Sequence, residues 1–175
     1  MLDQLLTTII ATWPAQIIGF LALFISLTGY LFKEPKINLY FWGGSEIIWS
    51  VHLLLLGSLT GALILFASGI RLLLTAKIGA KRALPIIFLY ILTIWVITFL
   101  GAENKTDLLP AIASTFFSIA LFYTHKVHVF RFFDGLCIVT WLLFAVIITS
   151  VPSFLSDLVS LSILIISSYK MGLFS

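Results

Sequence analysis

The sequence predicts an all-α polytopic membrane protein, with seven transmembrane helices arranged as two parallel three-helix repeats joined by a linker helix. The chain has 175 residues, of which 61% are hydrophobic and 10% charged, and its mean hydropathy is +1.19. A soluble domain carries about 25% charged residues. We therefore expect lipid to be the solvent and no separate soluble catalytic domain. The single cysteine, Cys137, excludes an intramolecular disulfide.

Seven apolar runs, each about as long as one bilayer crossing, follow one another along the chain. They span residues 13–32, 37–56, 58–76, 83–100, 108–124, 129–148 and 152–169. Charged or turn-forming residues separate them, which indicates helix ends. The gap at Gly57 carries no charge, so we expect a tight turn there. The first dozen residues contain no Lys or Arg, which favours a short interfacial segment over a signal peptide.

The positive charges fall at alternate connections between the runs. Nine of the ten Lys and Arg residues lie on one side: Lys33, Lys36, Arg71, Lys77, Lys81, Arg82, Lys126, Arg131 and Lys170. The other side has only Lys105. Cytoplasmic loops carry the excess of Lys and Arg, which predicts an N-terminus outside and a C-terminus in the cytoplasm. Because topology accounts for these charges, we expect no nucleic-acid partner.

An internal repeat with an offset of 92 residues divides the chain into one membrane domain with three parts. Residues 13–77 form the first three-helix unit, 83–100 the linker helix and 108–170 the second unit. The offset places Gly43 on Gly135 and Trp49 on Trp141. An odd number of spans inverts the next copy, and the linker helix restores its direction. SWEET-type transporters are built in this way, with their site near the midplane between repeats.

Small residues follow one face of the first span and the matching face of the fifth. Gly19, Ala22 and Ser26 recur at helical spacing in the first, and Ala111, Ser114 and Ser118 in the fifth. Small side chains let helix backbones approach closely in lipid. This pattern favours a duplication, although many membrane helices have such a face.

Several short segments, in order along the chain, resemble the YgjV-type family of bacterial inner-membrane proteins. They are Ala15-Gln16 with Gly19, Val51-His52 to Leu56-Gly57, Gly61-Ala62 to Ile70-Arg71, and Leu108-Leu109-Pro110. The resemblance implies a bacterial inner membrane and a PQ-loop or SWEET-like bundle. It implies no established substrate, activity or cofactor.

Polar and aromatic residues inside the predicted spans indicate a central pocket. Ionisable groups in membrane helices usually face the bundle interior or a wet cavity. The candidate substrate-binding residues are Ser45, Glu46, Trp49, His52, Arg71 and Trp141. Two further stripes are Asp134, Cys137, Trp141 and Phe144 in the sixth span, and Ser153, Asp157, Ser160 and Ser167 in the seventh. The competing interpretation is core packing for the tryptophans and an interhelical hydrogen bond for His52.

The depths of Glu46 and Arg71 predict an ion pair between the second and third spans. At 1.5 Å per residue, Arg71 lies about 9 Å and Glu46 about 14 Å below the basic side. Each charge alone costs roughly 2.5–3.5 kcal/mol on insertion scales, so mutual pairing is favoured. In the rival arrangement, Arg71 reaches the membrane interface and Glu46 is protonated.

We expect no enzyme, cofactor or metal site. His125 and His128 have helical ligand spacing but lack the further ligands that a metal needs. An intramembrane serine protease would have a glycine two positions before its serine. Ser68 has Phe66 at that position instead. The predicted function is a SWEET-like inner-membrane transporter that moves a small polar metabolite by alternating access. The alternative is a non-transporting membrane subunit that scaffolds or regulates a partner; a homo-oligomer is left open.

Overall fold

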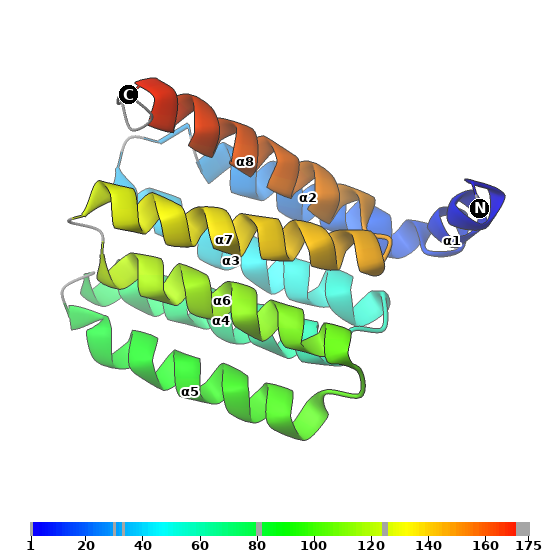
Figure 1. Ribbon diagram of the computed structural model, residues 1–175, viewed down its shortest axis with the longest axis horizontal. Coiled ribbons are helices and arrows are strands. Elements are labelled where there is room, and N and C mark those ends of the chain that lie inside the picture. The colour runs from blue at the N-terminus through cyan, green and yellow to red at the C-terminus, as the bar shows by residue number, and fades with distance from the viewer. Residues whose placement is uncertain (1, 30, 33, 80–81, 124–125, 171–175) are drawn as a thin grey trace.

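Long helices run side by side in the computed structural model of the chain, and α1 extends beyond one end of them (Figure 1). The structure describes residues 2–29, 31–32, 34–79, 82–123 and 126–170. The helices are α1 (Leu2–Ala11), α2 (Trp13–Gly29), α3 (Pro35–Leu55), α4 (Leu59–Ile78), α5 (Leu84–Gly101), α6 (Leu108–Phe122), α7 (Val127–Ile147) and α8 (Val151–Lys170). A short 3-10 helix, η2 (Lys105–Asp107), precedes α6. Helices α2 to α8 follow the seven predicted apolar runs to within a few residues.

Five helical segments are long and apolar enough to cross a membrane. They are α4, α5, η2 with α6, α7 and α8. Helix α2 is apolar but has only 17 residues. Helix α3 has 21 residues, but Lys36, Glu46 and His52 make it more polar. Length and composition of the described helices therefore support five spans and a shorter apolar helix, where the sequence predicts seven spans.

Six of the helices form a ring. Helix α3 packs between α2 and α4, and α7 packs between α6 and α8. Contacts of α4 with α6, and of α2 with α8, join these two groups. Helix α5 lies outside, against α4 and α6. An apolar core of Ile64, Tyr90, Ile94 and Ala111 forms where α4, α5 and α6 meet.

Glycines allow α3 and α4 to cross at close range. A Cβ atom on Gly43 would lie 3.0 Å from the carbonyl oxygen of Gly69, and one on Gly69 would lie 2.8 Å from that of Gly43. Both distances are shorter than ordinary contacts between such atoms. Small residues let backbones approach in this way, which maximises van der Waals packing between membrane helices.

The turn between α3 and α4 matches the turn between α7 and α8, 92 residues later. Gly57 has φ +85° and Thr149 has φ +57°, so both occupy the left-handed region. The amide of Ser58 donates to the Leu53 carbonyl at 2.9 Å, and the amide of Ser150 donates to the Ala145 carbonyl at 2.9 Å. Such bonds satisfy the last carbonyls of a helix. The predicted tight turn at Gly57 is confirmed.

The two ends of the bundle differ in charge. The basic end, where α3 and α7 begin, carries the exposed residues Lys36, Lys77, Arg82 and Lys126. The opposite end holds Lys105 in η2. Lys33 and Lys81, which contribute to the predicted asymmetry, lie outside the described residues.

Candidate functional site

A cavity of about 480 Å³ lies inside the ring. Its lining comes from α2, α3, α4, α6, α7 and α8. On α3 the lining runs from Leu39 to Leu53, and on α8 from Ser153 to Ser167. Each advance of 14 residues corresponds to about 21 Å at 1.5 Å per residue. The cavity therefore extends along most of the bundle, and its volume suits a small organic molecule.

Five of the six predicted substrate-binding residues line this cavity. They are Ser45, Glu46 and Trp49 on α3, Arg71 on α4 and Trp141 on α7. The two tryptophans come from different halves of the ring, and each is in edge contact with a second aromatic ring. The structure thus brings together residues that are up to 96 positions apart in the chain.

His52, the sixth predicted residue, lies outside the lining and is fully buried. Its Nδ1 lies 2.7 Å from the Ala15 carbonyl oxygen of α2, and its Nε2 lies 2.7 Å from the Ser150 hydroxyl beside α8. Because a carbonyl only accepts, Nδ1 carries the proton and donates. The Ser150 hydroxyl bonds both to Nε2 of His52 and to the Ser153 hydroxyl, each at 2.7 Å. His52 therefore ties three segments together.

Gln16 adds a second link between α2 and α8. Its Nε2 donates to the Thr149 carbonyl at 3.2 Å, and its Oε1 accepts from the Val151 amide at 3.2 Å. We call Gln16, His52 and Ser150 the seal, because they join α2, α3 and α8 at the end of the cavity. The seal lies at the end of the bundle opposite the basic end.

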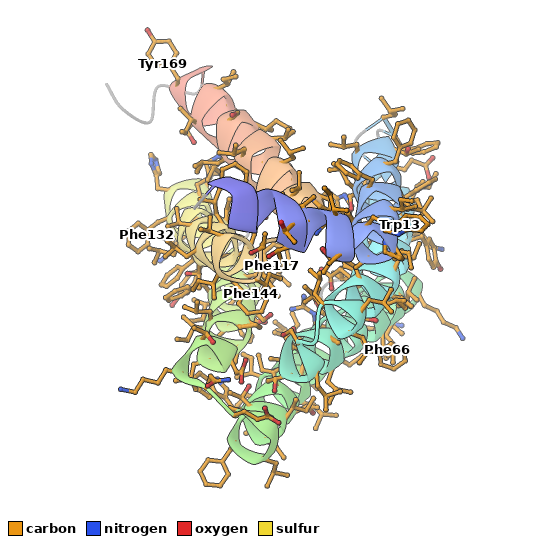
Figure 2. All side chains as sticks on the ribbon, turned by 90° about the vertical axis from the view of Figure 1, so that its right-hand side faces the viewer. Trp13, Phe66, Phe117, Phe132, Phe144 and Tyr169 are labelled. Carbon is orange, nitrogen blue, oxygen red and sulfur yellow. The ribbon has the colours of Figure 1, made fainter. Side chains whose placement is uncertain are left out.

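Helices α2 and α8 separate with distance from the seal. Figure 2, which looks along the bundle from the end where α1 lies, shows them diverging away from the viewer. Helix α2 contributes only Ser26 and Leu27 to the lining, both in the half nearer the basic end. Helix α2 therefore borders the cavity only in the half nearer the basic end, while the seal joins α2 to α3 and α8 at the other end.

Arg71 is held by hydroxyl groups on two helices. Its Nη1 donates to Ser118 on α6 at 3.0 Å, and its Nη2 donates to Ser68 at 3.1 Å. The guanidinium carbon lies 4.3 Å from the centre of the Tyr90 ring, a cation–π distance. These contacts anchor Arg71 at the junction of α4, α5 and α6.

The predicted ion pair between Glu46 and Arg71 does not form. Oε2 of Glu46 and Nε of Arg71 are both buried without a hydrogen-bond partner. The prediction was wrong because α6 brings Ser118 to the guanidinium, which donates to hydroxyls instead. The interfacial position of Arg71 in the rival arrangement is also wrong, since Arg71 is only 3% exposed.

Three charged residues that the predicted site omits also line the cavity: Asp134, Asp157 and Arg131. Both aspartates belong to the polar stripes of α7 and α8 in the sequence. Arg131 donates through Nη1 to the hydroxyls of Ser167 at 2.8 Å and Ser168 at 2.6 Å. The rule that ionisable residues in membrane helices face an interior cavity would have included all three.

No group of three or more His, Cys, Asp or Glu side chains that could hold a metal ion is found in the described part of the chain. The candidate pair His125 and His128 remains a sequence observation, since His125 lies outside the described residues.

Apolar helices around an interior cavity define a multi-pass membrane protein. A family model described as a bacterial inner membrane protein, Imp-YgjV, matches residues 13–173. The chain therefore belongs to the Imp-YgjV family and is a multi-pass protein of the bacterial inner membrane, as the sequence resemblance predicts. No match was found among curated proteins or among solved structures.

Proposed function

We propose that the protein carries a small polar metabolite across the inner membrane by alternating access, in a SWEET-like arrangement. One observation carries the proposal: the hydrogen-bonded seal joins α2, α3 and α8 at one end of the cavity, and α2 borders the cavity only in the half nearer the other end. A carrier stopped in one of its two states is closed at one end in this way. The reverse state would form if α2 and α8 parted at the seal and met at the basic end.

The packing of the helices supports a duplicated architecture. An offset of 92 residues takes α2, α3 and α4 to α6, α7 and α8. When each helix is exchanged for its counterpart, the contact between α4 and α6 becomes the contact between α8 and α2, and both contacts are present. A two-fold axis through the ring would relate them in this way. The matching turns at Gly57 and Thr149 obey the same offset. Two like halves around one cavity are the arrangement in which one half can rock against the other.

The charge asymmetry supports an orientation with the basic end in the cytoplasm. In this orientation the N-terminus is periplasmic, and the cavity of the present structure faces the cytoplasm. The seal then separates the cavity from the periplasm.

A thermal-shift screen on the purified full chain tests the proposal. The probes are amino acids, sugars, polyols, carboxylates and organic amines. We expect one class to raise the unfolding temperature, and Trp49→Ala to remove this effect because Trp49 lines the cavity. Trp13→Ala is the matched control, since Trp13 is 61% exposed and outside the lining. That variant should retain the response.

The alternative is a membrane subunit that scaffolds or regulates a partner. It predicts no response to any probe, together with one protein that co-purifies persistently. That result would contradict transport.

A further inference from the structure

The charged side chains of the cavity do not balance. Three carboxylates, Glu46, Asp134 and Asp157, face two guanidinium groups, Arg71 and Arg131. With every group ionised, the sum is −1. A charge within membrane helices is costly unless it is paired. A bound group of positive charge would complete the balance.

The guanidinium donors are largely engaged within the protein. Arg71 donates through Nη1 and Nη2 to Ser118 and Ser68, and Tyr90 covers one face, which leaves Nε. Arg131 donates through Nη1 to two hydroxyls and a carbonyl of α8. A bound anion would compete with these bonds.

The carboxylate acceptors are less engaged. Oε2 of Glu46 is shielded from solvent and accepts no hydrogen bond. The carboxylate of Asp157 also lines the cavity. The buried oxygen of Glu46, left without a donor, costs free energy that a ligand donor or cation would recover.

Aromatic rings supply the second element of cation recognition. Trp42 and Trp49 on α3 and Trp141 on α7 all line the cavity. The face of an indole ring attracts a cation within about 6 Å, and tryptophan does so best among aromatic residues. Carboxylates together with tryptophan faces are the combination that proteins use for ammonium groups with carbon substituents.

The same residues do not suit a metal ion. The three carboxylates come from three helices, and no described group of ligands converges on one point. The rest of the lining includes Leu27, Leu65 and Phe117, which provide apolar surface. A cation with an apolar body matches both features.

We propose that the cavity binds an organic ammonium cation with apolar substituents, with Asp157 and Glu46 neutralising its charge and the tryptophans contacting its body. This inference names the substrate class of the proposed carrier and rests on that proposal for the transport step only. Binding itself depends on the cavity alone.

Isothermal titration of the purified full chain with matched probes tests the inference. The cations are choline, tetraethylammonium and benzyltrimethylammonium. The neutral control is 3,3-dimethylbutan-1-ol, which replaces the nitrogen of choline by carbon, and the anionic control is benzoate. We expect saturable binding of at least one cation, with neither control competing. Asp157→Asn should weaken that binding at least tenfold.

Glu103→Gln is the matched variant, because Glu103 is an exposed carboxylate outside the cavity. It should bind as the wild type does. If Asp157→Asn does not yield folded protein, Glu46→Gln replaces it. Competition between choline and its neutral analogue on the wild-type protein also tests the inference without any variant. Equal binding of the neutral or anionic control, no cation binding, or unchanged affinity in both variants would overturn the inference.

Uptake into proteoliposomes separates the two proposals. Binding of a cation without uptake would contradict transport and leave the ligand class intact. Uptake of a neutral or anionic solute, with no cation binding, would contradict the ligand class and leave transport intact.

Discussion

Adding one methyl group at Gly19 should open the seal. A Cβ atom there would lie 2.8 Å from Nδ1 and Cε1 of His52 and would overlap Cγ of Pro152. Ordinary contacts are about 3.5–4.0 Å. Helix α2 would therefore have to move by about 0.7 Å, which stretches the 2.7 Å bond between His52 and Ala15 beyond the usual range.

The cost follows from two terms. Overpacking a tight site costs about 1–3 kcal/mol, and a lost hydrogen bond costs about 0.5–1.5 kcal/mol. Gly44→Ala provides the reference, because Gly44 is also helical but a Cβ there meets nothing within 4 Å. The gain in helix propensity on replacing glycine is common to both variants. We expect Gly19→Ala to be less stable than Gly44→Ala by about 2–4 kcal/mol.

Reversible unfolding of the two variants in mixed detergent micelles measures this difference. The seal should also leak in Gly19→Ala, so that Ser153→Cys, at the sealed end of the cavity, reacts faster with a thiol reagent in that background. Equal stability and equal reactivity in the two glycine variants would refute the packing described for α2, α3 and α8.

Two further predictions concern Arg71 and the orientation of the chain. Ser118→Ala should lower the free energy of unfolding by about 1.5–3 kcal/mol, because it removes an acceptor from a buried guanidinium. Ser26→Ala, whose hydroxyl bonds only within α2, should change it little; equal losses would contradict the role of Ser118. Arg82→Cys and Asn104→Cys, each in a background without the native cysteine, should be labelled from opposite faces of the membrane. Labelling from the same face would exclude the seven-span topology.

The helix positions could be predicted because they depend on local sequence. Apolar runs of spanning length, separated by charges and glycines, locate α2 to α8 to within a few residues. The turn at Gly57 follows from a glycine between two runs. Its counterpart at Thr149 carries no such signal, because a threonine with positive φ is unusual.

The site could be predicted only in part because its limits depend on tertiary packing. A helical wheel places Ser45, Trp49 and His52 on one face, yet His52 is not part of the cavity lining and instead bonds to Ala15 and Ser150. The start of α8 packs against α2 at the depth of His52. The sequence periodicity of α3 cannot predict this packing, because it depends on two other helices. Arg71 shows the same limit, since its partner Ser118 comes from α6, 47 residues away in the chain.

Alternating access predicts that one cavity residue is reachable from both sides of the membrane. Ser160 on α8 lines the cavity, so Ser160→Cys, without the native cysteine, reports access by its rate of reaction with an impermeant thiol reagent. We expect fast reaction from the basic end and slower, measurable reaction from the opposite end. A reducible cross-link between Gln16→Cys and Val151→Cys should abolish only the slower reaction, and cleaving the link should restore it. Reaction from one side alone, unchanged by the cross-link, would contradict a moving carrier and indicate a static membrane subunit.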